Sequence, residues 1–196
     1  MKDLILWAGK QTVLFSDGKK LWTAEVKEQG RKASVSSYLY FSEDKDGEKE
    51  KPPKGIISFL SAHHMSIRHI CLVIPLEQCR MKRIRFPSMT HQELDDTFQW
   101  EKERLFHSRR ESLFDYDIVS ENEEGYDLLA YSCSEEVLTA WKDRIIREGG
   151  SAPSFIPEAA LLTAFFYGRS GMAFRGTDRG LFIIFFHQGQ WIDQQY

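Results

Sequence analysis

One helix-forming segment, residues 90–106, most constrains what this chain can fold into. Thr90 and Glu93 have the spacing of a capping box, in which a hydroxyl and a carboxylate satisfy backbone N–H groups at the helix start. Met89 and Leu94 stand where a hydrophobic staple packs against the first turn. The sequence therefore predicts a well-capped helix over this segment.

The predicted helix carries a carboxylate on its apolar face. At about 100° per residue, Glu101 falls in the middle of a stripe that consists of Leu94, Phe98 and Leu105. An ionised carboxylate in such a place is costly unless it is paired, and Lys82 on the preceding strand is the expected partner. The alternative is a helix rolled so that Trp100 is buried and Glu101 is half exposed.

The strand before the helix, Cys79–Phe86, should alternate between two faces, because successive side chains of a strand point in opposite directions. Lys82 shares the face toward the expected core with Ile84 and Phe86, and the other face carries Arg83 and Arg85. Our candidates for partner binding or for a structural clamp are Lys82, Arg83, Arg85, Trp100, Glu101 and Arg104.

Alternation and turn residues predict a β-meander at the N-terminus. Its strands are Leu4–Ala8, Gln11–Ser16, Lys20–Glu28 and Ser34–Phe41, with Asp17-Gly18 as a hairpin turn. The following tract, Ser42–Lys54, contains no apolar residue, so it cannot bury enough surface to order itself. We expect this tract to be a boundary between subdomains.

Helices and strands mix after the charged tract. The expected strands are His69–Ile74, Cys79–Phe86, Phe114–Val119, Tyr126–Cys133, Ser154–Ile156 and the hairpin arms Leu181–His187 and Gln190–Gln194. The expected helices are Gly55–Ala62, the segment capped by Ser134, and the segment that Pro157 opens and Gly168 ends. Residues Gly168–Gly180 are expected to form a loop.

Composition excludes several classes of partner. Twenty-six basic and 29 acidic side chains give a net charge of -3, which argues against nucleic acid and against an anionic membrane surface. Three cysteines without C-x-x-C spacing fit a reduced intracellular setting. No apolar run approaches the roughly 20 residues that span a bilayer, so we expect no direct membrane insertion by this segment.

Three further groups of residues were considered as chemical sites. A metal could be held by His63, His64, His69, Cys71 and Cys79, but their spacing matches no standard zinc pattern. Gly168–Gly180 contains glycines and arginines that could hold a phosphate, but it lacks the P-loop order. The carboxylates Glu111, Asp115 and Asp117 are expected to form an exposed polar edge. We therefore expect no catalytic residue and no metal.

Five short motifs occur in a recognisable order. They are Ile74-Pro75, Lys82 leading to Phe86-Pro87, Glu93-Leu94, Trp100-Glu101 and Asp115-Tyr116. In this order and spacing, residues 70–166 resemble the PilM family, the actin-like cytoplasmic proteins of type IV pilus assembly. They resemble more distantly the GspL-type cytoplasmic domains of type II secretion.

The chain departs from actin-like ATPases where those proteins hold nucleotide. Two hairpins there carry Asp-x-Gly, and the aspartates handle the metal-bound phosphates. Here Trp7-Ala8-Gly9 and His187-Gln188-Gly189 take these places, so Gly9 and Gly189 remain and both aspartates are missing. A phosphate–Mg²⁺ site without carboxylates loses most of its charge. We expect no cofactor, with ATP and Mg²⁺ disfavoured.

The resemblance implies an α+β or α/β chain, with an actin-like (ribonuclease H-like) subdomain and an inserted α+β subdomain. Residues 1–53 would form the first part of the actin-like subdomain, residues 54–149 the insertion, and residues 150–196 the return. The last long apolar strand has a single short partner in the sequence. We therefore expect the chain to be an N-terminal portion of a longer protein.

The resemblance also implies a function: a non-catalytic cytoplasmic scaffold in type IV pilus assembly or a related type II secretion machine. The implied partners are a PilN-like bitopic membrane protein, the assembly ATPase, or a second copy of the chain. The protein would then lie at the inner membrane through its partners. One alternative is an actin-like ATP-binding protein or ATPase with divergent nucleotide motifs, and another is an unrelated α+β interaction module.

Overall fold

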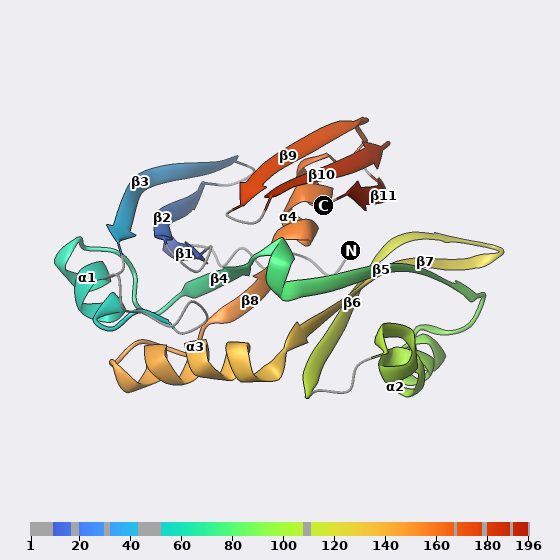
Figure 1. The fold of residues 1–196 in the computed structure, drawn as a ribbon, viewed down its shortest axis with the longest axis horizontal. Helices are drawn as coiled ribbons and strands as arrows, with labels where there is room; N and C mark the ends of the chain where they lie inside the picture. Colours follow the sequence, from blue (N-terminus) through green and yellow to red (C-terminus); the bar gives the residue numbers. More distant parts are fainter. Residues whose placement is uncertain are drawn as a thin grey trace. The chain divides into compact units, whose positions relative to one another are not determined.

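The computed structural model describes residues 10–16, 20–29, 32–42, 52–107, 111–166, 168–177, 180–188 and 190–195 (Figure 1). The chain forms two compact units, Met1–Phe155 and Ile156–Tyr196. The predicted strand Leu4–Ala8 and most of the charged tract lie outside the described residues. The proposed boundaries of the actin-like and inserted subdomains stay a prediction.

The first sheet of the larger unit has the strand order β3-β2-β1-β4-β8. The strands are β1 (Lys10–Ser16), β2 (Lys20–Gln29), β3 (Lys32–Ser42), β4 (Ile70–Ile74) and β8 (Ser154–Pro157). The predicted hairpin is confirmed, because β1 and β2 pair antiparallel up to Ser16 and Leu21. By contrast, β1 pairs parallel with β4. The N-terminal β-meander therefore shares one sheet with a strand that follows the charged tract.

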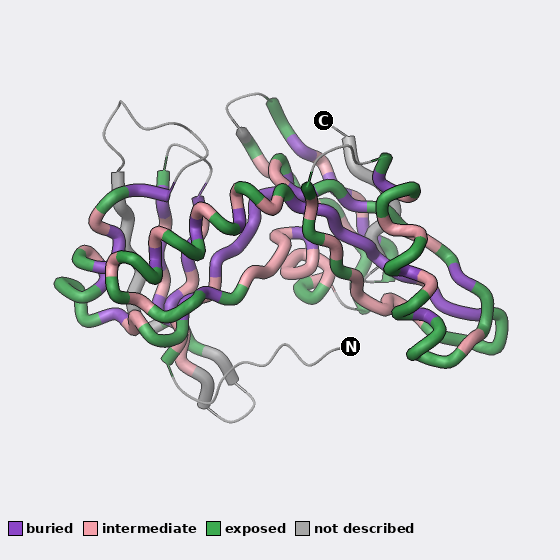
Figure 2. The backbone as a smooth tube through the Cα atoms, turned by 90° about the horizontal axis from the view of Figure 1, so that it is seen from below, coloured by how far each residue is buried: buried purple, intermediate pink, exposed green. Residues whose placement is uncertain are grey.

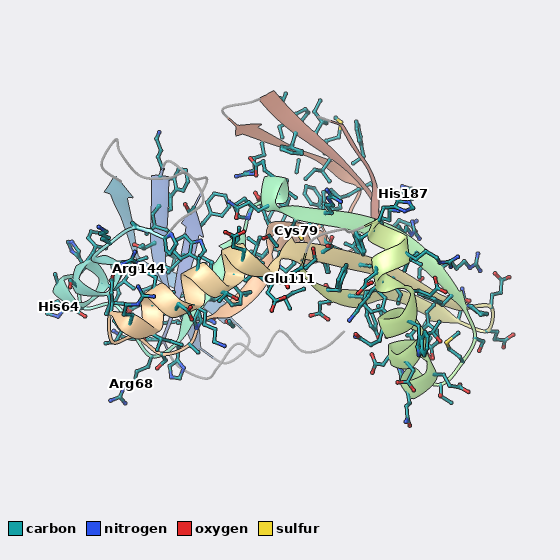
Figure 3. The ribbon with its side chains drawn as sticks, turned by 60° about the horizontal axis from the view of Figure 1, so that its bottom comes forward. His64, Arg68, Cys79, Glu111, Arg144 and His187 are labelled. Carbon is teal, nitrogen blue, oxygen red and sulfur yellow. The ribbon has the colours of Figure 1, made fainter. Side chains whose placement is uncertain are left out.

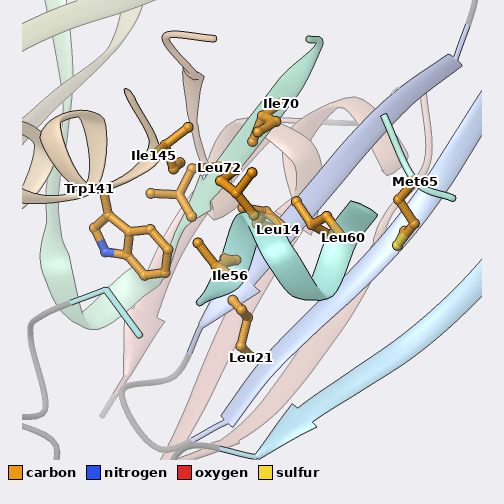
Figure 4. Packing of buried hydrophobic residues seen from close by; sticks show 10 residues of the cluster. Leu14, Leu21, Ile56, Leu60, Met65, Ile70, Leu72, Trp141 and Ile145 are labelled. Carbon is orange, nitrogen blue, oxygen red and sulfur yellow. The ribbon is translucent and has the colours of Figure 1, made fainter. Parts of the chain in front are cut away.

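Two helices supply the hydrophobic core of this sheet: α1 (Ile56–Ala62) and α3 (Glu135–Arg147). Fully buried side chains from both helices meet leucines of the strands (Figure 4), and the cluster includes Leu14, Leu21, Ile56, Leu60, Leu72, Trp141 and Ile145. The predicted Ser134 cap of α3 is confirmed, because its hydroxyl accepts a hydrogen bond from the N–H of Val137.

A glutamate at the end of α3 caps the start of α1. The carboxylate of Glu148 accepts hydrogen bonds from the N–H of Gly55 at 3.0 Å and from that of Ile57 at 3.3 Å. The first N–H groups of a helix have no intrahelical partner and carry partial positive charge, so a carboxylate there stabilises the helix. Arg144 lies 3.7 Å from the same carboxylate. The bond between Glu148 and Gly55 joins two segments that are 93 residues apart.

The second sheet of the larger unit has the order β5-β7-β6. Its strands are β5 (Cys79–Pro87), which follows the short 3-10 helix η1 (Leu76–Gln78), β6 (Ser112–Asn122) and β7 (Gly125–Ser134). The central strand β7 is buried along nearly its whole length (Figure 2). Its first residue must be glycine, because a Cβ at Gly125 would lie 2.0 Å from the carbonyl oxygen of Phe86.

Helix α2 (His91–Phe106) packs on this second sheet. Its buried side chains Leu94, Phe98 and Phe106 join a cluster with Phe86 and Leu128 of the strands. The prediction is confirmed for Leu94 and Phe98 of the stripe, whereas Leu105 is only partly buried. Aromatic contacts add to the cluster: the Phe98 and Tyr116 rings meet edge to face at 4.8 Å.

The predicted capping box of α2 is confirmed. The backbone N–H of Glu93 donates to the Thr90 hydroxyl at 3.3 Å, and the Glu93 carboxylate accepts from the backbone N–H of Thr90 at 2.7 Å. Met89 packs against the same core cluster as Leu94, as the predicted staple requires.

The smaller unit consists of helix α4 (Glu158–Phe165) and a sheet of the order β11-β10-β9. The strands are β9 (Gly171–Thr177), β10 (Gly180–His187) and β11 (Gln190–Gln195). The predicted final hairpin is confirmed, since His187 pairs with Gln190.

The prediction of a loop over Gly168–Gly180 is wrong, because Gly171–Thr177 is a strand that pairs along β10. The glycines and the arginine of this segment are not typical of a strand in the sequence. The strand forms by pairing with β10. Arg175 of this strand forms an ion pair with Glu158 of α4 at 3.0 Å, and both side chains are largely buried.

The capping box predicts a pH-dependent contribution to stability. Hydrogen bonds from the backbone N–H of Thr90, and next from its hydroxyl, hold the pKa of Glu93 below 4.5, its ordinary value. A carboxyl with a lowered pKa in the folded state adds stability above the unfolded pKa, and this is lost as the pH falls through the folded pKa. We expect Glu93→Gln to lower the urea midpoint at neutral pH.

The difference between wild type and Glu93→Gln should shrink as the pH falls below 4.5. Tryptophan fluorescence during urea unfolding at a series of pH values measures it. Glu103→Gln, an exposed position near the other end of α2, is the control and should show no such convergence. A difference in urea midpoint between wild type and Glu93→Gln that stays constant with pH would contradict this role of the Glu93 carboxylate.

Candidate functional site

The C-terminal end of α2 is held by two cations of β5. The Lys82 ammonium donates a hydrogen bond to the carbonyl oxygen of Leu105, and the Arg80 guanidinium donates to that of Phe106 at 3.4 Å. The last carbonyls of a helix have no intrahelical partner and carry partial negative charge. Lys82 therefore points to the α2 side of β5, as the alternation predicted, and it acts there as a helix cap.

The predicted pair between Lys82 and Glu101 is wrong. Both side chains are described, and Glu101 bonds instead to Arg104 one turn along the same helix, with its carboxylate 2.5 Å from Nε. The Glu101 side chain is 31% exposed, because its position lies at the margin of the apolar stripe and the carboxylate reaches water. Lys82 has a carbonyl partner nearby, so neither group is left unpaired.

The alternative is wrong for Trp100, although the partial exposure that it expected for Glu101 is found. Trp100 is 86% exposed on the outer face of α2. Tryptophan is usually largely buried in folded proteins, and exposed indoles are enriched where proteins bind partners. Helix spacing places Asp96 and Glu103, both exposed, one turn to either side of this indole. The outer face of α2 therefore offers an aromatic surface beside two carboxylates.

Two further candidate cations, Arg83 and Arg85, lie on the opposite face of β5. Arg83 bonds to Asp127 of the neighbouring strand β7 at 3.1 Å, and Arg85 forms an ion pair with Glu124 in the turn between β6 and β7. The six candidate residues therefore form two groups on two faces of the second sheet and its helix. Exposed pairs of this kind contribute little to stability.

Of the two glycine hairpins, the second is partly described. Gly9 and Gly189 themselves lie outside the described residues. Beside the second, Gln188 has a left-handed φ of 51° and donates its backbone N–H to the Ser170 hydroxyl at 3.0 Å. That hydroxyl lies 3.3 Å from Nδ1 of His187. Among the described residues, this turn offers amide, hydroxyl and imidazole groups, which do not replace a carboxylate ligand of Mg²⁺.

The residues considered for metal binding are not brought together. Figure 3 shows His64 beyond α1 and Cys79 at the start of β5, in different parts of the larger unit. No group of three or more candidate ligands is found within the described residues. Cys79 instead lies beside Cys133.

The acidic side chains of β6 have ordinary structural partners. Asp117 accepts a hydrogen bond from the Tyr131 hydroxyl at 2.9 Å, and Asp115 accepts from the backbone N–H of Tyr116 at 2.9 Å. Burial and the nearby Asp117 carboxylate raise the pKa of Tyr131. These contacts make β6 part of a hydrogen-bonded framework.

Sequence reasoning missed the tyrosines that fasten α2 to its sheet. Tyr116 of β6 donates its hydroxyl to Asp95 of α2, and Tyr126 of β7 donates to the carbonyl of Met89 at 2.8 Å. Burial, and then the bond to Asp95, raises the pKa of Tyr116. A period-two pattern could have placed both tyrosines on the α2 face, but their acceptors depend on how the helix sits on the sheet.

The fold is actin-like. With a TM-score of 0.75 and 13% identity, the structure matches a chain of the PilM–PilN type IV pilus biogenesis complex, over 96% of this chain and 61% of the other. It matches the cytoplasmic domain of EpsL, an inner-membrane component of the Vibrio cholerae type II secretion system, with a TM-score of 0.57, 10% identity, and coverage of 94% and 70%.

A third solved structure is a Bacteroides thetaiotaomicron protein of unknown function with an actin-like ATPase fold. Here the TM-score is 0.52 and the identity 11%, over 99% of this chain and 72% of the other. No model of a known protein family matches the sequence, and no curated protein matches it.

The structural resemblance confirms the similarity to PilM and to GspL-type domains at the level of fold. The chain spans 61% of the length of the matched chain of the PilM–PilN complex. Within the described part of the chain, none of the helices has the length and hydrophobicity that a bilayer crossing requires.

The contacts of α2 predict different costs for two substitutions. Lys82→Met removes a charge-assisted hydrogen bond to a helix C-terminus, and we expect a loss of about 0.5–1 kcal/mol in the free energy of unfolding. Glu101→Gln removes only a solvent-exposed ion pair within one helix, and we expect a loss of at most about 0.5 kcal/mol. Urea unfolding of both variants measures these values. If Glu101→Gln lost more unfolding free energy than Lys82→Met, the result would contradict this assignment and favour a buried pair.

Proposed function

We propose that this chain is a non-catalytic adaptor of a type IV pilus assembly machine or of a related type II secretion machine. The observation that carries the proposal is the match, over 96% of the chain, to a chain of the PilM–PilN type IV pilus biogenesis complex. The match to the EpsL cytoplasmic domain supports the same kind of role. In this role the protein would lie on the cytoplasmic side of the inner membrane and be held there by partners.

The chemistry of the glycine hairpins supports a role without catalysis. Phosphoryl transfer depends on cations that neutralise phosphate charge and on carboxylates that hold those cations. The sequence has Trp7, Ala8, His187 and Gln188 beside the two hairpin glycines, and none of these side chains is acidic. The groups around His187 can donate or accept hydrogen bonds, but they cannot supply the missing negative charge.

A second candidate function is nucleotide binding by an actin-like protein with divergent motifs. It is favoured by the likeness to the Bacteroides thetaiotaomicron protein with an actin-like ATPase fold. Such a protein would need acidic residues from positions that the two hairpins do not supply. Binding of ATP therefore separates the two candidates.

We expect no change in melting temperature when ATP and Mg²⁺ are added in excess, because a ligand that does not bind the native state cannot stabilise it. Differential scanning fluorimetry with ATP, ADP and Mg²⁺ alone measures this. A known actin-like ATPase is the positive control. A concentration-dependent rise with ATP and Mg²⁺ would favour the second candidate.

The outer face of α2 is our proposed contact surface for the partner. Its indole, Trp100, is available to solvent and sits on a helix that is fixed at both ends, by the capping box and by the cations of β5. A rigid aromatic side chain loses little conformational freedom on binding and so makes an effective anchor. The proposed partner is the cytoplasmic segment of a PilN-like membrane protein or the assembly ATPase.

Trp100→Ala should separate binding from folding. Because the indole is 86% exposed, we expect the free energy of unfolding to change by no more than about 0.5 kcal/mol. Affinity for a synthetic peptide of the PilN-like cytoplasmic segment should fall about tenfold or more. Isothermal titration calorimetry measures this affinity, and Gln99→Ala, also exposed on α2, is the matched control. Equal affinities of wild type and Trp100→Ala would place the partner elsewhere.

A further inference from the structure

Two cysteines meet at one end of the second sheet. Cys79 is the first residue of β5 and Cys133 is the next-to-last residue of β7, and the antiparallel register makes them direct partners. Their sulfur atoms lie 3.0 Å apart. Each residue is only 6% exposed, and both thiols are free.

The backbone of this pair suits a disulfide. Directly opposed residues of antiparallel strands have Cα atoms about 4.5 or 5.5 Å apart, and disulfides bridge Cα separations of about 4.4–6.8 Å. The sulfurs are already in contact, so a small side-chain rotation brings them to bonding distance. The third cysteine, Cys71, lies on β4 in the other sheet of the larger unit.

The neighbours of the pair connect it to the rest of the second sheet. Cys79 precedes Arg80, whose guanidinium holds the end of α2. Cys133 precedes Ser134, which caps α3. The two cysteines are 54 residues apart along the chain, and the segment between them contains all of α2 and β6. A covalent bond here would close that segment into one loop.

We propose that Cys79 and Cys133 form a redox modification site, at which a peroxide converts the two thiols into a cross-strand disulfide. One thiol displaces hydroxide from hydrogen peroxide, which gives a sulfenic acid and water. The second thiol then attacks the sulfenic sulfur and releases a second water. Both sulfurs are oxidised by one electron each, and the peroxide takes up the two electrons and the two thiol hydrogens.

The surroundings of the pair set its response. Contact with the Cys133 thiol, together with burial, raises the pKa of Cys79. The thiolate is the reactive form of cysteine, so we expect this buried pair to be oxidised slowly. The disulfide fixes β5 to β7 at the end of the sheet where Arg80 contacts α2. This inference does not depend on the proposed function.

The test uses the whole reduced chain, treated with hydrogen peroxide under native conditions and then mapped by mass spectrometry without reduction. We expect one cross-linked peptide pair that joins Cys79 to Cys133, and an intact mass lower by two hydrogen atoms. A phosphine reductant should reverse both. Cys71→Ser is the matched control and should form the same cross-link.

Folding defects are distinguished by comparing the three single-serine variants. Cys79→Ser and Cys133→Ser should each abolish the cross-link, and circular dichroism reports whether they are folded. In Cys71→Ser, the oxidised form should melt roughly 5–10 °C above the reduced form, because the bond restricts the unfolded chain. The proposal is overturned if folded protein yields only higher oxides at Cys79 or Cys133, a cross-link to Cys71, no oxidation, or a cross-link only after unfolding.

Discussion

The parallel pairing of β1 with β4 is the interaction on which the larger unit depends. It sets Thr12–Phe15 beside Ile70–Val73, across the charged tract that separates them in sequence. The fully buried Thr12 fixes this pairing twice: its backbone N–H donates to the carbonyl of His69 at 2.8 Å, and its hydroxyl donates to that of Ser66 at 2.7 Å. Parallel strands cannot be joined by a tight turn. Between β1 and β4 the sequence contains β2, β3 and α1, and α1 packs against this sheet.

Helix α3 extends that arrangement to the second sheet. It starts at Ser134, directly after the central strand β7, and it ends at the carboxylate that caps α1. Between these points Trp141 and Ile145 fill the core of the first sheet. One helix thus shares a covalent start with one sheet and a hydrophobic core with the other. The apolar face of α3 packs in the core of the first sheet, and Glu148 at its end caps α1.

The candidate surface on α2 owes its rigidity to groups that themselves need not touch a partner. Tyr116 and Tyr126 fasten the helix to the sheet, the capping box fixes its start, and Arg80 and Lys82 fix its end. This leaves the outer face free to carry an exposed indole without loss of stability. A rigid helix with an exposed aromatic side chain fits the adaptor role proposed above.

The sequence by itself determined the features that depend on neighbours within one turn or one hairpin. The capping box of Thr90 and Glu93, the Ser134 cap, the β1–β2 hairpin and the two faces of β5 are of this kind, because their partners lie a few residues away. The order of motifs around Trp100-Glu101 also sufficed to indicate the actin-like fold.

Only the tertiary structure decided which distant groups meet. Lys82 bonds to a carbonyl and leaves Glu101 to Arg104, Gly171–Thr177 becomes a strand against β10, and Cys79 faces Cys133. Side-chain periodicity fixes the direction of a residue relative to its own element, but the partner depends on the register and packing of a second element. Those are set by the burial of the whole core and by the pairing of strands, which no local pattern encodes.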